Sequence, residues 1–126
     1  MAILIGAIIP FLLGFLWYSP AMFGNVWVEA IGKKREELEP PIARHAIAIV
    51  GWLAASFVFA FLISHPDIQG IRDYIFLSFM LWGAFMMPAK ATAIVQGNFN
   101  TKLLWIDGGY QLAGYLIMSF VFALFV

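Results

Sequence analysis

Four long apolar segments occupy most of this sequence, at about residues 2–23, 43–64, 74–95 and 102–125. Each is near the roughly 20 residues that a helix needs to cross the hydrocarbon core of a bilayer. The segments are too long for barrel strands and lack strict alternation, so helices are the structure that satisfies their backbone in lipid. The sequence therefore predicts an all-α protein, a four-transmembrane-helix bundle that forms one integral membrane domain over residues 1–126.

The composition also favours a membrane environment. Of the 126 residues, 63% are hydrophobic and only 11% are charged, whereas soluble domains have about 45–50% apolar and about 25% charged residues. A soluble fold of this size could not hide so much apolar surface, so the lipid bilayer is the expected partner. Seven basic residues balance seven acidic ones, which argues against binding to nucleic acid. The chain has no cysteine, which excludes disulfides, thiolate metal sites and a cysteine nucleophile.

An aromatic motif follows the first apolar segment, and an amphipathic stretch follows the motif. Trp17 and Tyr18 are residue types that gather at membrane interfaces, and Ser19-Pro20 marks a break at the end of the span. Between residues 23 and 38, apolar side chains recur at helical spacing until charged residues take over. The sequence therefore predicts a short amphipathic interfacial helix between the first two spans.

Basic residues near the ends of the spans predict the orientation. Five of them lie at one end of the expected bundle: Lys33, Lys34, Arg35, Arg44 and Lys102. The opposite end carries only Arg72. The positive-inside rule therefore predicts that the loops at the basic end are cytoplasmic and that both termini lie outside. The run Lys33-Lys34-Arg35 could contact lipid phosphates, but neighbouring glutamates dilute it, so a solvated turn is the favoured interpretation.

Lys90 and Asp107 are the only ionisable residues well inside the predicted spans. They flank the turn at Gly97–Asn100 at similar distances, so two antiparallel helices would bring them to about the same depth. A charge at membrane depth costs about 2.5–3.5 kcal/mol on insertion scales, and pairing reduces that cost. The pair is either part of a polar or titrating site for a proton or ion, or a salt bridge that holds two helices together. The lysine stem could also reach towards the interface.

Helix-breaking residues lie close to this pair. Pro88 leaves the carbonyl of Ala84 without its usual donor, and Gly108-Gly109 is an expected weak point at nearly the same depth on the facing helix. Paired irregularities at matching depth are typical of binding sites in transporters, although glycines also simply allow close helix packing. Further hydrogen-bonding groups are expected around the site from Tyr110, Gln111, Thr92 and Gln96.

Small residues recur at four-residue spacing on several predicted helices, including Gly6, Pro10 and Gly14 on the first. Such stripes let neighbouring helices approach closely, and four spans alone make a thin wall for a pathway. We therefore expect a homo-oligomer, with a dimer favoured. Pro10 also removes the hydrogen bond to the Gly6 carbonyl, which predicts either a gate hinge or, as the favoured interpretation, a packing kink.

Two motifs carry a family resemblance. The first is the run Leu16-Trp17-Tyr18-Ser19-Pro20, followed by Phe23-Gly24 and Trp27. The second and looser one is Trp105 with Gly109-Tyr110 in the last apolar segment. Both resemble a bacterial membrane-protein family, domain of unknown function 1761, over essentially the whole chain. The resemblance implies a protein of the bacterial inner membrane with no assigned activity, so no residue roles carry over. Small multidrug transporters share the size and the four spans, but the first segment lacks their membrane glutamate.

No enzyme arrangement is visible in the sequence. There is no suggestive Ser–His–Asp spacing, no pair of membrane carboxylates and no glycine-rich phosphate loop, so no catalytic residue, metal or other cofactor is expected. His45 and His65 would lie about 30 Å apart along one helix and could not share a metal within one chain. One expected function is a small oligomeric transporter or channel for a solute or ion, with Lys90 and Asp107 at its polar site. The alternative is a structural or lipid-binding membrane scaffold.

Overall fold

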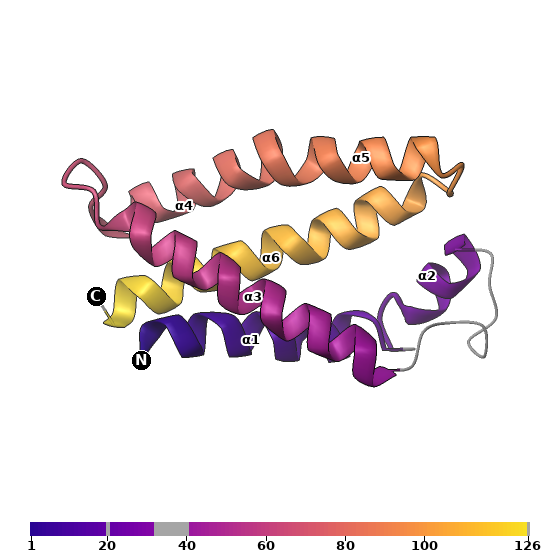
Figure 1. Cartoon of the computed structure of the whole chain (residues 1–126), viewed down its shortest axis with the longest axis horizontal. Helices are drawn as coiled ribbons and strands as arrows, with labels where there is room; N and C mark the ends of the chain where they lie inside the picture. Colours follow the sequence, from indigo (N-terminus) through magenta and orange to yellow (C-terminus); the bar gives the residue numbers. More distant parts are fainter. Residues whose placement is uncertain (20, 32–40, 126) are drawn as a thin grey trace.

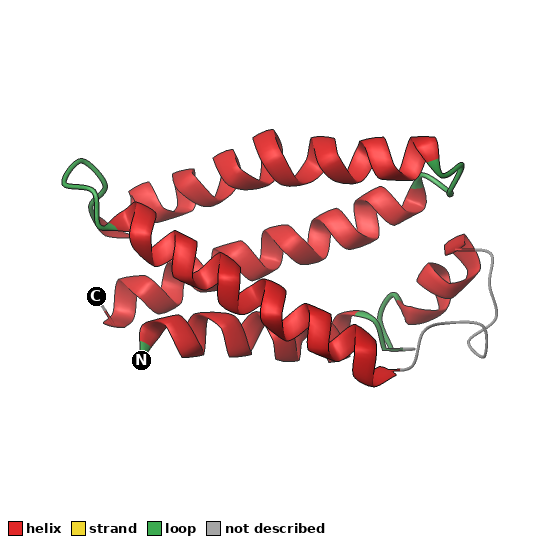
Figure 2. Cartoon of the chain, in the orientation of Figure 1, coloured by secondary structure: helices red, strands yellow, loops and turns green. Residues whose placement is uncertain are grey.

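The computed structural model describes residues 1–19, 21–31 and 41–125, and within these ranges it contains helices and turns but no strand (Figure 2). This confirms the predicted all-α class. The helices follow in the order α1 (Ala2–Trp17), α2 (Gly24–Ile31), α3 (Pro41–Ile63), α4 (Gly70–Leu81), the π-helical turn η2 (Trp82–Met86), α5 (Met87–Gln96) and α6 (Lys102–Phe125).

The helix α6 is the centre of the arrangement. It packs against α1 on one side and against the continuous arm of α4, η2 and α5 on the other, and α3 crosses over α1 (Figure 1). The chain runs up and down, so both termini lie at one end of the bundle, while α2 and the turn between α5 and α6 lie at the other (Figure 1). The residues on either side of that turn are therefore held near α2.

Three stretches are long and apolar enough to cross a membrane: Ile42–Ile63, Gly70–Gln96 and Lys102–Phe125. These agree closely with the predicted second and fourth spans, and the third begins four residues earlier than predicted. The structure therefore supports a helical membrane protein with three candidate spans among the described residues, and the four-span bundle stays a prediction.

The predicted first span, residues 2–23, is too long. The helix α1 ends at Trp17 after 16 residues, about 24 Å at 1.5 Å per residue and below the roughly 20 residues of a full span. It ends because the chain turns back: the amide of Phe23 donates to the Trp17 carbonyl at 3.0 Å, and the amide of Gly24 donates to the Ser19 carbonyl at 2.9 Å. The Ser19-Pro20 break lies inside the predicted range, and the apolar residues Ala21, Met22 and Phe23 after it carried the predicted span past the end of the helix.

The predicted interfacial helix is present as α2, which begins directly after the turn. Its membrane-surface position stays a prediction. Pro20 and the stretch 32–40, which holds the basic run Lys33-Lys34-Arg35, lie outside the described residues.

At the same end of the bundle, hydrogen bonds cap the two helices that meet at the turn between α5 and α6. The Gly97 amide donates to the Ala93 carbonyl at 3.0 Å, and the Asn100 carboxamide oxygen accepts from the Lys102 amide at 2.9 Å.

The packed core lies where α1, α3 and α6 meet. Ala7, Phe59, Met118 and Phe122 are almost completely buried there. The hydroxyl groups of the buried serines form hydrogen bonds with backbone carbonyls and with one another, as polar groups between membrane helices do. The Ser78 and Ser119 hydroxyl oxygens lie 2.6 Å apart, which joins α4 to α6. This core fixes α6 relative to α1, and so positions the polar residues nearer the α2 end.

Candidate functional site

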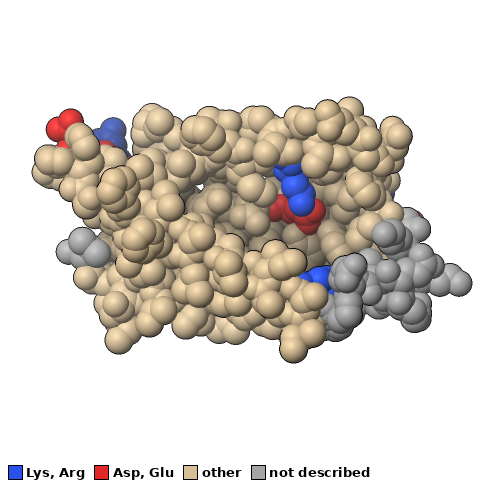
Figure 3. All heavy atoms as spheres, in the orientation of Figure 1, with Lys and Arg blue, Asp and Glu red and all other residues tan. Residues whose placement is uncertain are grey.

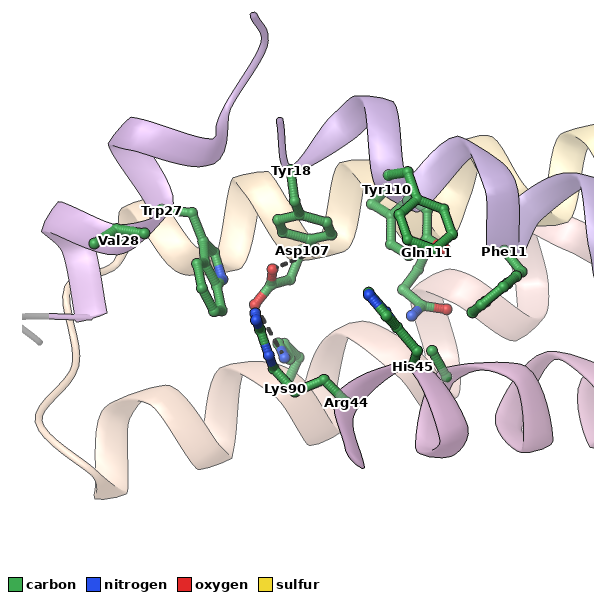
Figure 4. Close-up of a pocket in the computed structure, with 13 residues that line it drawn as sticks. Phe11, Tyr18, Trp27, Val28, Arg44, His45, Lys90, Asp107, Tyr110 and Gln111 are labelled. Carbon is green, nitrogen blue, oxygen red and sulfur yellow. Dashed lines mark hydrogen bonds and ion pairs between the residues drawn. The ribbon is translucent and has the colours of Figure 1, made fainter. Parts of the chain in front are cut away.

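A pocket of about 430 Å³ opens at the α2 end of the bundle (Figure 4). Side chains from α1, α2, α3, α5 and α6 and from the residue after α1 line it. Its polar and aromatic lining residues are Phe11, Phe15, Tyr18, Trp27, Arg44, His45, Lys90, Asp107, Tyr110 and Gln111. The space-filling view shows the same face hollowed, with basic and acidic side chains exposed inside the hollow (Figure 3).

The ion pair expected between Lys90 and Asp107 is present in this pocket. The Lys90 Nζ lies 3.1 Å from Asp107 Oδ2, and the side chains are 34% and 13% exposed. The Tyr18 hydroxyl donates to Asp107 Oδ1 at 2.5 Å. Both carboxylate oxygens are therefore occupied, one by an ammonium and one by a neutral donor, as a charge held away from water requires.

Tyr18 reaches Asp107 because of the turn that follows α1. The Trp17 indole N–H donates to the Ile106 carbonyl at 3.0 Å, which fastens the end of α1 to α6 one residue before Asp107. The Tyr18 ring then packs edge-on against Trp27 at a centroid distance of 5.6 Å. A Cβ on Gly24 would lie 2.2 Å from the Tyr18 carbonyl oxygen, so the turn requires glycine there. The aromatic motif thus builds one wall of the pocket.

Tryptophans from three elements hold α6 around Asp107. Besides Trp17, the Trp82 indole donates to the Gly108 carbonyl at 2.7 Å. The Trp52 indole donates to the Tyr110 hydroxyl at 2.9 Å, and that hydroxyl donates to the Pro10 carbonyl at 2.7 Å. These bonds restrain the carboxylate's helix from α1, α3 and η2 together, so the position of Asp107 depends on the whole bundle.

The model for the family "Protein of unknown function (DUF1761)" matches residues 1–123. The chain belongs to this family. The match confirms the resemblance noted in the aromatic motif, although the family description assigns no activity. No curated protein and no solved structure matches the chain. Function in this DUF1761 protein must therefore be argued from the pocket itself.

The structure of this DUF1761 member brings most of the predicted polar residues together, with two exceptions, Thr92 and Gln96, neither of which lines the pocket. Lys90, Asp107, Tyr110 and Gln111 all line the pocket. Thr92 does not: it is exposed, and its hydroxyl donates to the Pro88 carbonyl of its own helix at 2.8 Å. Threonine often bonds the preceding turn in this way, so its position two residues from Lys90 turns it away from the pocket.

Four lining residues that carry polar groups were not predicted as part of the site: Tyr18, Trp27, Arg44 and His45. The sequence places Tyr18 and Trp27 in the family motif, Arg44 among the basic residues that predict the orientation, and His45 near the start of the second span. The one available signal was the density of aromatic residues just after α1, which is higher than a membrane boundary requires. Among the described residues, no group of three or more potential metal ligands is present.

The structure shows one of the predicted helix irregularities and not the others. A π-helical turn lies directly before Pro88, where the missing proline donor was expected to disturb the helix. By contrast, α6 is a continuous α-helix through Gly108 and Gly109, with no break at the predicted weak point. A Cβ on Gly108 would lie 2.5 Å from the Met87 Sδ, and one on Gly109 would lie 3.2 Å from the Trp17 ring. These glycines serve close packing.

Pro10 lies inside α1, which continues through it to Trp17. The residue is buried, and its carbonyl accepts the Tyr110 hydroxyl. The bond ties the middle of α1 to α6 beside the pocket. The proline is therefore part of a packed contact between two helices, in keeping with the packing interpretation.

Replacing Tyr18 by phenylalanine tests the wall that the motif builds. Tyr18→Phe is expected to lower the free energy of unfolding by about 1–3 kcal/mol, because a buried carboxylate oxygen loses its donor. Unfolding in mixed detergent micelles, followed by circular dichroism, measures this. Tyr115→Phe is the matched control, since its hydroxyl has no recorded hydrogen bond with a described residue. Equal losses in the two variants would contradict the assigned bond.

Proposed function

We propose that this protein is a small membrane transporter or channel whose Lys90–Asp107 pocket binds the solute or ion that crosses. The observation that carries the proposal is that the ion pair faces a pocket of about 430 Å³, with the lysine side chain 34% exposed. A salt bridge that only joined α5 to α6 would be expected to lie sealed between them. A membrane-embedded ionisable pair that opens onto a cavity is instead typical of a substrate or ion site.

The arrangement of donors supports binding of an acceptor group. An ammonium has three protons to donate, and among the described residues Lys90 has one recorded partner, Asp107. Its remaining donors can therefore serve a bound solute. His45 on α3 and Gln111 on α6, one turn beyond Asp107, add groups that can donate or accept (Figure 4). No step in this proposal requires a reaction, and we do not propose an enzyme.

Flux measurements test the proposal. In proteoliposomes that contain a pH-sensitive or chloride-sensitive dye, Asp107→Asn is expected to abolish the flux that the unmodified protein supports, because it removes the charge that orders Lys90. Size-exclusion chromatography checks that the variant still assembles, and Thr92→Val, outside the pocket, is the matched control. The doubly reversed variant, Lys90→Asp with Asp107→Lys, is expected to stay inactive. Full flux in the reversed variant would mean that the pair is a structural salt bridge and not the binding site for the transported solute or ion.

We also propose that the protein acts as a homodimer in a bacterial inner membrane, with the α2 end in the cytoplasm. Support comes from the arm formed by α4, η2 and α5, since only 6% of its candidate span is buried inside the chain, against 39% for α6. The exposed small residues Ala89, Ala93 and Gly97 follow one face of this arm at four-residue spacing, which lets a second helix come close.

Crosslinking tests the dimer. Cysteine introduced at Ala93 of the otherwise cysteine-free chain is expected to form a disulfide-linked dimer in native membranes, because both copies would present it at the shared interface. Cysteine at Leu12, an exposed position on α1, is the control and should stay monomeric. Monomer alone from the Ala93 variant at every expression level would overturn the proposed dimer.

A further inference from the structure

A second cavity continues the pocket along the side of the bundle. It has a volume of about 410 Å³ and lies between α3 and the arm of α4 and η2, with α6 as its floor. Its lining is almost wholly apolar: Ala54, Ala55, Val58, Phe59, Leu81, Phe85, Met86 and Tyr115. Figure 3 shows this face hollowed between the two halves of the molecule, with charged side chains at one end of the hollow.

The pocket and this apolar groove adjoin one another. On α3, Ala48 lines the pocket and Ala55 lines the groove. Gly51 falls between them on the same helix face, and a Cβ placed on it would meet nothing within 4 Å. On α6, Gln111 lines the pocket and Tyr115, one turn further, lines the groove. The two cavities therefore form one lateral depression, about 21 Å long from Arg44 to Val58 at 1.5 Å per residue.

Charge is distributed unevenly along this depression. At the pocket end, Lys90 and Arg44 face the single carboxylate of Asp107. Both oxygens of that carboxylate are taken, by Lys90 and Tyr18, and Arg44 has no ion pair with any described residue. Among the described lining residues, the pocket end therefore has two basic side chains against one acidic side chain, while the groove has no charged side chain. The depression matches a ligand with an anionic head and an apolar tail.

The groove also opens sideways, towards the surface that a bilayer would cover. Val58 and Phe85, on its two rims, are 50% and 72% exposed, and both belong to candidate spans. A molecule that lies in it therefore has to come from the hydrocarbon layer. That position favours a lipid over a water-soluble solute or a protein segment.

We propose that the depression binds an anionic phospholipid, with its phosphate held by Arg44 and Lys90 and one acyl chain lying in the groove between α3 and η2. The second acyl chain remains in the bilayer, because the groove is open along its side. This inference rests on the proposed function in one respect only: it uses the same pocket, and it assigns that pocket a bound lipid without requiring the lipid to be transported.

The test compares two lipids with identical acyl chains. Delipidated protein in detergent is titrated with phosphatidylglycerol or with zwitterionic phosphatidylcholine, and bound lipid is counted by native mass spectrometry. Both lipids carry a phosphate, but phosphatidylcholine also brings a fixed cation next to the two basic side chains. Phosphatidylglycerol is therefore expected to bind about tenfold more tightly. Arg44→Gln is expected to remove this preference. Equal binding of the two lipids by the unmodified protein would overturn the proposal.

Two variants test the acyl-chain position. Gly51→Leu adds a side chain on the face of α3 between the pocket and the groove, where the first added atom, the Cβ, meets nothing within 4 Å, and it is expected to weaken binding of both lipids about tenfold. Ala46→Leu is the control, because Ala46 is exposed on another face of α3, away from the face that carries Ala48 and Ala55. Unchanged binding in Gly51→Leu would exclude the groove. Val58→Trp, which fills the groove from its rim, is the second variant should Gly51→Leu fail to assemble.

The outcomes separate this inference from the proposed function. Flux in proteoliposomes without any preference for phosphatidylglycerol would retain the transporter and overturn the lipid site. A preference for phosphatidylglycerol that depends on Arg44 and Gly51, together with no flux, would retain the lipid site and overturn the transporter.

Discussion

Lys90→Met is expected to lower the free energy of unfolding by about 3 kcal/mol, considerably more than Asp107→Asn. Removing one partner of a buried ion pair costs about 3–5 kcal/mol, because the other charge stays buried alone. Lys90→Met leaves a carboxylate that is only 13% exposed, whereas Asp107→Asn leaves an ammonium whose side chain is 34% exposed. The flexible lysine stem can carry its charge towards water or the interface, so Asp107→Asn should cost only about 1 kcal/mol.

Reversible unfolding in mixed micelles, applied to both single variants and the double variant, measures this asymmetry. The double variant, Lys90→Met with Asp107→Asn, is expected to be more stable than Lys90→Met alone, since no charge is then left unpaired. Lys102→Met is the control, because Lys102 is exposed at the start of α6 and should change stability by less than about 0.5 kcal/mol. A larger loss for Asp107→Asn than for Lys90→Met would contradict the assigned burial.

The ion pair is predictable from the sequence because only the turn and the helical rise determine which residues of the two helices lie at the same depth. The turn at Gly97–Asn100 fixes where the two helices begin and end, and the helical rise then sets the depth of every residue. Hydropathy alone locates the three long helical stretches for a similar reason, since a bilayer requires about 20 apolar residues from each. Both inferences use periodicity and length, and neither needs to know which helices are neighbours.

The other wall of the pocket is not predictable in this way. Tyr18 and Arg44 reach the Lys90–Asp107 pair from α1 and α3, and their approach depends on how these helices cross α6. The predicted first span also runs past Trp17, because the residues that follow the Ser19-Pro20 break are apolar and only the backbone hydrogen bonds of the turn show that the helix has ended. Pro88 marks where the arm is irregular, but only the structure gives the π-helical turn. Two adjacent glycines suggest a helix break, but at Gly108 and Gly109 the space that a side chain would need is occupied by Met87 and Trp17.

The location of the aromatic motif connects the fold to the pocket. Trp17 fastens α1 to the Ile106 carbonyl, and the next residue donates to the carboxylate one position along α6. A motif that would otherwise be assigned to the membrane interface therefore sets the geometry of the ionisable pair. Changes in this motif should disturb the pocket even where they do not touch it.

Gly24→Ala is expected to have the largest effect of any single methyl group in this region. The added Cβ would lie 2.2 Å from the Tyr18 carbonyl oxygen and 2.8 Å from the Ser19 carbonyl carbon and oxygen. All three are backbone atoms, which cannot rotate away as a side chain can. Overpacking of a tight site costs about 1–3 kcal/mol, and we expect the upper end, about 3 kcal/mol, because the turn has to open.

Opening that turn should move Tyr18 away from Asp107 and Trp27 out of the pocket, so the loss of stability should be accompanied by a local change. Amide hydrogen exchange of the segment from Tyr18 to Ile31 is expected to rise strongly in Gly24→Ala, while exchange in the Ser78–Ser119 region, far from the turn, stays close to that of the unmodified protein. Gly83→Ala is the matched control, since a Cβ there meets nothing within 4 Å. Unchanged exchange near Tyr18 in Gly24→Ala would mean that the turn does not position the pocket wall.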